Sequence, residues 1–297
     1  MSNILPNLLI IGAAKSGTTS LHNYLNQHPD IFMSSPKEPH FLINKEIGVQ
    51  RIPNAVVELG DYKKLFLGYR NKKYRGESSV MYLSFPEFTI RNIQKYLSED
   101  IKIIIMLRNP VERAYSGYQH VKRYNVMENL SFEEALKTAE NRYKNTHDMT
   151  PASRYLELGL YSEQVKVFSE SFKNIHIIIY DDYKINFKVE LDKVFNFLGV
   201  DTIKISDEKK HMVGGWEWKS KWIKFLIMKK NPIKTALQFI LPFKNLRKGI
   251  RVHLQKLNIK KVEKINPQTE LWLKTYYKND VEKLSQFLNR NLNNWTI

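Results

Sequence analysis

The most constraining stretch of this 297-residue chain is residues 8–22, which read LLIIGAAKSGTTSLH. Four large aliphatic residues suit a strand buried on both faces, and the polar residues that follow open a helix. A glycine-containing loop between a strand and a helix gathers backbone N–H groups, and the helix dipole adds positive potential there. Gly12 and Gly17 have the separation of an ATPase phosphate loop, but Lys15 precedes the second glycine. The stretch therefore predicts an anion site beside the first strand.

Two further apolar runs, IKIIIML at 101–107 and IHIII at 175–179, predict strands that are also buried on both faces. Helical patterns lie between and after the three strands, and a capping box opens one of them. They cover 111–124, a helix opening at Ser131 and Glu134, 159–172, 189–199 and 268–290. This alternation predicts an α/β fold with a parallel central sheet flanked by helices, built as one domain over 1–297.

Composition points to a negatively charged partner. Lys and Arg number 47 against 30 Asp and Glu, which gives a net charge of +17. Such a balance favours a nucleic acid, a membrane surface, a phosphorylated cofactor or an acidic glycan, although a generally lysine-rich composition is an open alternative. The chain has no cysteine, so disulfides, thiolate metal sites and cysteine nucleophiles are excluded. We expect no metal at the site.

Targeting signals are not evident in the sequence. The chain begins MSNILPNLL, without a basic region or a small-residue cleavage site. No run approaches the roughly eighteen apolar residues of a membrane-spanning helix. We therefore expect a cytoplasmic protein.

The loop at 15–20 reads KSGTTS and is suited to a phosphate group. Lys15 lies on the loop itself, and Thr18, Thr19 and Ser20 begin the helix, so the loop needs no magnesium ion to hold a phosphate. Ser16 and Gly17 complete this candidate site. The alternative is a turn that serves packing only.

A second candidate site follows the strand at 101–107. The segment RNPVERAYSGY at 108–118 places Arg108 after the strand and Ser116 about two helical turns later, roughly on one face. Arg108 can make a bidentate, charge-assisted contact to a phosphate. The alternative is that Arg108 and Arg113 are solvated positions at a helix start.

Together these two motifs resemble the sulfotransferase family, and the resemblance extends over most of the chain. It implies a P-loop-like sulfotransferase fold and the donor 3′-phosphoadenosine 5′-phosphosulfate, whose product is adenosine 3′,5′-bisphosphate. KSGTTS is similar to the family's 5′-phosphosulfate loop, and RNPVERAYSGY to its 3′-phosphate motif. The resemblance assigns the 5′ end to Lys15, Ser16, Gly17, Thr18, Thr19 and Ser20, and the 3′-phosphate to Arg108 and Ser116. Lys15 would stabilise the departing phosphate, with Ser16 holding the lysine beforehand.

The segment PKEPHFL at 36–42 resembles the Lys-Glu-x-His-Phe-Phe element of heparan-type glycan sulfotransferases, with Leu42 in place of the second phenylalanine. The resemblance makes Glu38 the general base on the acceptor and places His40 beside it as the alternative base. It implies a hydroxyl, or an amine, on a carbohydrate or glycolipid as acceptor. A surface role for Glu38 and a structural role for His40 remain open.

A further segment, RGESSVMY at 75–82, resembles the family's Gly-Glu-Lys-(Ser/Thr)-Pro-x-Tyr element. Ser78 stands where lysine is common and Val80 where proline is common, so an acceptor contact through that lysine is in doubt. Glu77 and Tyr82 are expected either to line the acceptor site or to support it from behind.

Residues 209–264 are basic and aromatic, and we expect them to form a helical, lid-like region within the domain. HMVGGWEWKSKW at 211–222 falls where the family closes a loop over the nucleotide, and Lys219 or Lys221 is a candidate contact. The mixture of apolar and basic residues over 216–251 is also typical of a peripheral membrane contact, which would suit a lipid-linked acceptor at the inner membrane face. A lid with a solvated basic face is the plainer alternative.

Two other functions compete with sulfuryl transfer. A P-loop kinase or NTPase would use IIIYDDY at 177–183 as a metal-holding strand, with Asp181 or Asp182 as ligand. Against it stand the displaced Lys15 and the arginine that ends the strand at 101–107. A nucleic-acid-binding protein fits the charge, but no recognition motif for DNA or RNA is present, so we expect no nucleic acid partner.

Overall fold

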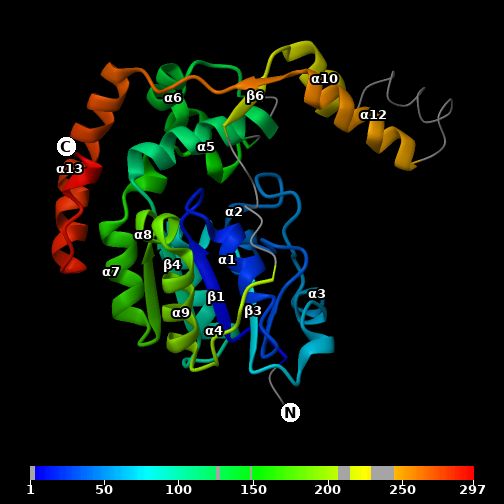
Figure 1. Cartoon of the computed structure of the whole chain (residues 1–297), viewed down its shortest axis with the longest axis vertical. Helices are drawn as coiled ribbons and strands as arrows, with labels where there is room; N and C mark the ends of the chain where they lie inside the picture. Colours follow the sequence, from blue (N-terminus) through cyan, green and yellow to red (C-terminus); the bar gives the residue numbers. More distant parts are fainter. Residues whose placement is uncertain (1–3, 125–127, 148, 207–214, 229–243) are drawn as a thin grey trace.

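The computed structural model describes residues 4–124, 128–147, 149–206, 215–228 and 244–297 (Figure 1). Its core is a five-stranded sheet in the order β2-β3-β1-β4-β5, with every neighbouring pair parallel. The strands are β1 (Leu8–Gly12), β2 (Ile31–Met33), β3 (Tyr74–Ser78), β4 (Lys102–Leu107) and β5 (Ile175–Ile179). The predicted α/β fold and its three apolar strands are confirmed, while β2 and β3 were not predicted.

Helices cover both faces of the sheet, which explains why β1 is buried along its whole length. Leu8 and Ile10 face one side and Leu9 and Ile11 the other, as the alternation of a strand requires. The first side packs against α1 (Thr18–Leu25), α8 (Tyr180–Ile185) and α9 (Phe187–Leu198). The second side packs against α3 (Leu59–Lys64), α4 (Pro86–Tyr96) and α7 (Ser162–Ser171).

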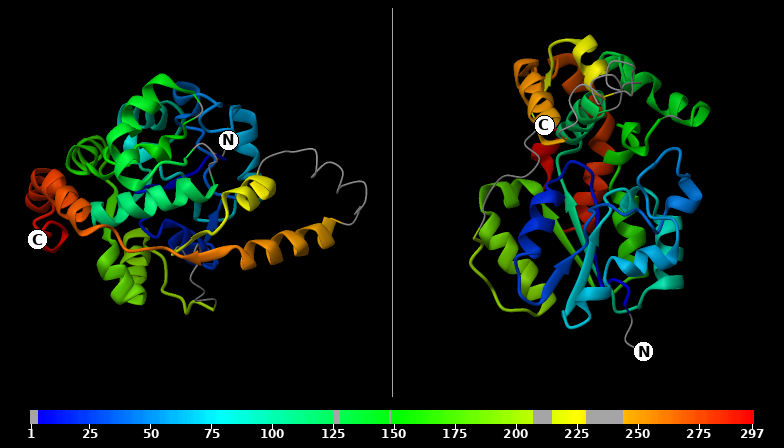
Figure 2. Two further views of the ribbon diagram at one scale, coloured as in Figure 1. Left: turned by 90° about the horizontal axis from the view of Figure 1, so that it is seen from above. Right: turned by 90° about the vertical axis from the view of Figure 1, so that its right-hand side faces the viewer.

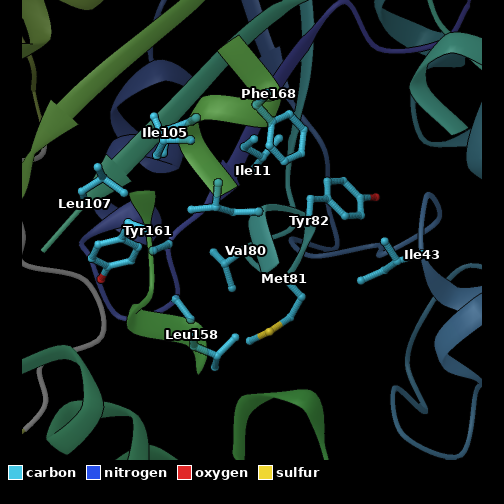
Figure 3. Close-up of a cluster of buried hydrophobic side chains, with 14 of the residues drawn as sticks. Ile11, Ile43, Val80, Met81, Tyr82, Ile105, Leu107, Leu158, Tyr161 and Phe168 are labelled. Carbon is cyan, nitrogen blue, oxygen red and sulfur yellow. The ribbon is translucent and has the colours of Figure 1, made fainter. Parts of the chain in front are cut away.

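The larger of the two cores lies on the second side (Figure 3). Ile11 and Ile105 extend from the strands toward Phe168 of α7, and Val80 and Tyr82 close the cluster from the segment after β3. All five side chains are less than a tenth exposed. This packing fixes the ends of β1, β3 and β4 relative to one another.

Several further elements gather beyond the carboxyl edge of the sheet (Figure 1). Helix α5 (Pro110–Tyr124) crosses that edge, and α6 (Phe132–Asn145) packs beside it. A two-stranded antiparallel ribbon, β6 (Trp216–Trp218) with β7 (Ile259–Lys261), packs on α5. The other elements are α2 (Asn44–Ile47), α10 (Lys221–Met228), α12 (Lys244–Leu257), α13 (Pro267–Phe287) and the 3₁₀ turns Leu67–Tyr69, Tyr82–Ser84, Pro151–Ser153, Glu157–Gly159 and Asn293–Trp295.

The helix predictions hold with small shifts at the ends. Helix α6 opens with the predicted capping box, in which Glu134 N–H donates to Ser131 Oγ at 3.2 Å and Ser131 N–H donates to the Glu134 carboxylate at 2.9 Å. Gly199 ends α9 with a positive φ of 61°. Helix α7 begins at Ser162 rather than Gly159, because Glu157–Gly159 forms a separate 3₁₀ turn. The single domain over 1–297 stays a prediction.

The start of α7 is capped from a distant helix instead of by its own sequence. Tyr161, which precedes the helix, provides no side-chain cap. The carboxylate of Asp280 on α13 instead accepts the backbone N–H of Tyr161 at 2.8 Å and that of Ser162 at 3.1 Å. One carboxylate therefore satisfies helix-terminal donors, complements the helix dipole and attaches α13 to the body.

We expect Asp280→Ala to lower the free energy of unfolding by about 1–3 kcal/mol, because it leaves these donors without a partner. The urea midpoint should fall while the slope of the transition stays unchanged. Glu282→Ala, at an exposed position on the same helix, is the matched control and should leave the midpoint nearly unchanged. Equal midpoints for the two variants would contradict the assignment.

Candidate functional site

A cavity of about 1080 Å³ lies at the carboxyl ends of β1 and β4. From β1 the chain continues to β2 on one side of the sheet, and from β4 it continues to β5 on the other side. Open α/β sheets bind ligands at the carboxyl ends of two neighbouring strands whose connections diverge in this way. All of the predicted site residues except Ser16 line this cavity. They are Lys15, Gly17, Thr18, Thr19, Ser20, Glu38, His40, Arg108 and Ser116.

The loop between β1 and α1 is tightly wound against β4. Ala13 N–H donates to the Met106 carbonyl at 2.7 Å, and Lys15 and Gly17 both have positive φ, at 69° and 91°. A Cβ at position 17 would lie 2.9 Å from the Tyr180 ring, so only glycine fits there. No side chain caps the first turn of α1. The start of this helix therefore faces the cavity with its backbone donors uncapped.

Ser16 lies beneath the loop and is fully buried. Among the described residues its hydroxyl has no hydrogen-bond partner, which is uncommon for a buried polar group. The expectation that Ser16 holds Lys15 is not met. The partner of the lysine is instead His120 of α5, whose Nδ1 lies 3.3 Å from the Lys15 Nζ.

The ammonium of Lys15 lies in a strongly electropositive environment. Burial, followed by the Arg123 and Arg108 cations, lowers the pKa of Lys15 to about 8, although Glu38 acts in the opposite direction. Burial also lowers the pKa of His120 to about 4, so its ring is neutral at pH 7 and accepts a hydrogen bond from Lys15. An anion beside Lys15 would relieve this repulsion between cations.

Glu38 and His40 lie together in the cavity wall, both with positive φ, at 64° and 52°. The Glu38 carboxylate is 2.6 Å from Lys37 Nζ and 3.4 Å from His40 Nε2. Burial opposes ionisation of Glu38, but the hydrogen bond from His40 and the Lys37 ammonium outweigh it and hold its pKa well below the usual range. Glu38 is therefore an anion at neutral pH.

The segment that carries Glu38 and His40 rests on the buried carboxylate of Glu77. This side chain is fully buried and accepts hydrogen bonds from the hydroxyls of Tyr62 at 2.9 Å, Tyr82 at 2.6 Å and Ser79 at 2.6 Å. Ser79 Oγ in turn accepts the His40 N–H at 3.0 Å, and the Tyr82 hydroxyl accepts the N–H of Leu42 at 3.2 Å. Glu77 and Tyr82 thus support the Glu38 segment from behind and do not line the cavity.

Arg108 joins the two predicted anion sites. One of its Nη atoms donates to the Lys15 carbonyl at 3.2 Å, and its guanidinium lies 5.0 Å from the centre of the Tyr180 ring. Its Nε and the other Nη atom both donate to Oε2 of Glu112, at 3.0 and 2.7 Å. Glu112 is half-exposed, so its carboxylate is a surface partner that an anionic ligand can replace. Ser116 lies two helical turns further along α5, on the cavity wall.

Sequence reasoning missed several residues of the cavity. His120 and Arg123 of α5 and Tyr180 of α8 all line it. His120 is four residues after Ser116, a spacing that places both on one helix face and was a usable signal. Nothing in the local sequence distinguishes Tyr180, because it reaches the loop from the end of β5.

The kinase alternative is not favoured by the placement of its acidic residues. Asp181 accepts the indole N–H of Trp295 at 2.7 Å, and Asp182 forms an ion pair with Arg290 at 2.7 Å. Both carboxylates are committed to the segment after α13, and neither lines the large cavity.

The ribbon within the expected lid, β6 with β7, packs over α5. Trp218 donates its indole N–H to the Arg123 carbonyl at 3.1 Å, and Glu217 pairs with Lys122 at 3.5 Å and Lys260 at 3.0 Å. Gly215 before β6 and Val262 after β7 line the cavity. Lys219 Nζ donates to Leu257 O at 3.4 Å and does not line the cavity. The expected features at 209–214 and 229–243, and the side chain of Lys221, lie outside the described residues.

Within the described ranges, none of the helices is both long and apolar enough to cross a bilayer.

Known proteins resemble this chain along much of its length. Mouse carbohydrate sulfotransferase 15 is 28% identical, over 69% of this chain and 45% of that protein. Human bifunctional heparan sulfate N-deacetylase/N-sulfotransferase 2 is 26% identical, over 72% of this chain and 25% of that protein. The chain thus spans less than half the length of these curated relatives.

A solved structure agrees over nearly the whole chain. The crystal structure of a sulfotransferase from Alicyclobacillus acidocaldarius superposes with a TM-score of 0.71 at 28% identity, covering 98% of this chain and 99% of that one. The family model described as the sulfotransferase domain matches residues 5–234. This match takes in β1, the loop at 15–20 and the Arg108–Ser116 segment. The chain therefore belongs to the sulfotransferase domain family.

Proposed function

We propose that this chain transfers a sulfuryl group from 3′-phosphoadenosine 5′-phosphosulfate to a hydroxyl, or an amine, of a carbohydrate or glycolipid acceptor. One observation carries the proposal. Lys15 and its loop, the Arg108–Ser116 pair and the ionised Glu38 all line a single cavity of about 1080 Å³. Two anion sites and a base in one space are what transfer from a doubly phosphorylated nucleotide requires.

The residues present fit such a donor. The close approach permitted by Gly17 and the uncapped start of α1 suit the 5′-phosphosulfate. Thr18, Thr19 and Ser20 add hydroxyls on the same rim. Arg108 and Ser116 suit the 3′-phosphate, which would replace the Glu112 carboxylate as the partner of the Arg108 guanidinium.

The chain's own groups supply the chemistry around the donor, whose bound sulfuryl group passes to the acceptor. Glu38 accepts the proton of the attacking hydroxyl, and His40 keeps the carboxylate oriented through the contact at 3.4 Å. Lys15 stabilises the charge that develops on the departing phosphate. His120, 3.3 Å from the Lys15 Nζ, holds the ammonium in place before the donor arrives. His40 is the alternative base.

The acceptor class follows from relatives whose names refer to carbohydrate and heparan sulfate. A sugar hydroxyl or amine is the corresponding acceptor here. A cytoplasmic location stays a prediction from the sequence. Calorimetry with adenosine 3′,5′-bisphosphate in the presence of EDTA tests the donor assignment, and magnesium-dependent ATP turnover without affinity for that nucleotide would favour a kinase instead.

We expect Lys15→Ala to abolish sulfuryl transfer, because it removes the cation beside the leaving phosphate. Glu38→Gln should lower kcat by about 10²–10⁴-fold with little change in donor affinity, because it removes only the base. Transfer of radiolabelled sulfate from the donor to a panel of desulfated glycans measures the rate, and calorimetry measures the affinity. If Glu38→Gln weakens donor binding and leaves kcat intact, Glu38 is a binding residue.

We also expect the affinity for adenosine 3′,5′-bisphosphate to fall above pH 8. The pKa of Lys15 is lowered to about 8 in the free protein, and a bound anion raises it. Binding is therefore strongest below pH 8 and weakens by up to about tenfold per pH unit as pH rises from there toward the pKa of the complex. Calorimetry between pH 7 and 9.5 measures this. Lys15→Arg stays charged and should remove the dependence, and a dependence retained in that variant would exclude Lys15 as its source.

A further inference from the structure

Helices α10 (Lys221–Met228) and α12 (Lys244–Leu257), here called the arm, leave the body between β6 and β7 (Figures 1 and 2). In both figures α12 extends away from the sheet and its covering helices. Large apolar side chains on the arm are exposed to solvent: Trp222 is 79% exposed and Leu257 is 63% exposed. Exposed apolar side chains gathered on one element mark an interaction surface.

Four of the five large apolar residues of α12 form one stripe, and Val252 lies outside it. Leu246, Ile250, Leu254 and Leu257 follow one another at intervals of four, four and three residues, which places them on a single helix face. Their exposed fractions are 50%, 41%, 44% and 63%. In the sequence, the Lys and Arg residues of this segment fall at other positions of the helical repeat, beside the stripe or opposite it. A helix with an apolar face and a basic face is typical of one that lies in a membrane interface.

The charge of the region favours an anionic partner over a second copy of the chain. From Lys219 to Leu257 the sequence holds 11 Lys and Arg residues and no Asp or Glu. Two such arms would repel each other if they paired. A polyanion such as nucleic acid would satisfy the charge but would leave the apolar stripe in water. A bilayer that contains anionic lipids satisfies both.

The ribbon of β6 and β7 links the base of the arm to the wall of the large cavity. At the base of the arm, Asn258 accepts hydrogen bonds from Lys219 N–H at 2.8 Å and Ser220 N–H at 3.0 Å. Gly215 and Val262 lie opposite each other at the other end of the ribbon, and both line the cavity. Whatever binds the arm is therefore held close to the cavity.

We propose that the arm binds the surface of a membrane containing anionic lipids, with the apolar stripe of α12 and Trp222 of α10 in the interface. A membrane contact of the arm would also present a lipid-linked glycan at the same surface to the cavity that Glu38 lines. This role in positioning the acceptor rests on the proposed function. The membrane contact itself is independent of the reaction.

Sedimentation with vesicles tests the proposal on the full chain. We expect binding to vesicles of phosphatidylglycerol and phosphatidylcholine, weak binding to phosphatidylcholine alone, and loss of affinity as salt is raised. The triple variant Leu246→Ser, Leu254→Ser, Leu257→Ser should bind at least about tenfold more weakly. Ile185→Ser with Leu271→Ser and Phe287→Ser removes three exposed apolar side chains outside the arm and should bind like the unmodified protein.

Fluorescence adds a measurement that needs no change to the stripe. Quenching by brominated lipids should be substantial in the unmodified protein and should fall in Trp222→Phe, because Trp222 would lie in the interface. Equal binding to both vesicle types, equal effects of the two triple variants, arm-dependent dimerisation without vesicle binding, or binding of DNA without vesicle binding would each overturn the proposal. Calorimetry with adenosine 3′,5′-bisphosphate separates the two ideas: vesicle binding without nucleotide affinity rejects the proposed function and leaves the arm's role standing.

Discussion

The buried ammonium of Lys15 is the interaction around which the cavity is arranged. Burial, followed by the nearby cations Arg123 and Arg108, makes the charged form of Lys15 unfavourable and lowers its pKa. Within the described cavity wall, the neutral ring of His120 and the carboxylate of Glu38 offset part of that cost. The arrangement is stable enough to fold yet retains positive potential that only an anionic ligand neutralises, so it is preorganised for such a ligand.

The buried carboxyl group of Glu77 supports the segment that carries Glu38. Glu77 has no cation among its hydrogen-bond partners, and hydroxyls from three positions satisfy its oxygens. Burial raises its pKa, while these hydrogen bonds act in the opposite direction. Because the same hydroxyls of Ser79 and Tyr82 hold the backbone at His40 and Leu42, the position of Glu38 depends on a network in the core. Glu38, the base that we propose, thereby acquires the rigidity of the sheet although its own segment is irregular.

The pattern of apolar residues in the sequence predicted much of the fold but not all of it. The runs at 8–11, 101–107 and 175–179 were readable as strands because helices cover both of their faces. Strand β3 could not be predicted in this way, because its sequence YRGES looks polar. Glu77 is buried there only because its hydrogen-bond partners come from separate segments of the chain. The predicted site residues after β1 and β4 lie in one cavity because the carboxyl ends of parallel strands share one edge of the sheet. The link from Lys15 to His120 spans 105 positions and had no local signal beyond helical spacing.

The segment after α13 shows how a distant part of the chain bears on the cavity. Trp295 and Arg290 bind Asp181 and Asp182 in the first turn of α8, directly after Tyr180, whose ring packs on Gly17 and Arg108. Local opening of that segment would loosen α8 and, through Tyr180, the wall of the loop. Amide hydrogen exchange in α8 should therefore follow exchange near Trp295, and the two would slow together when a ligand fills the cavity.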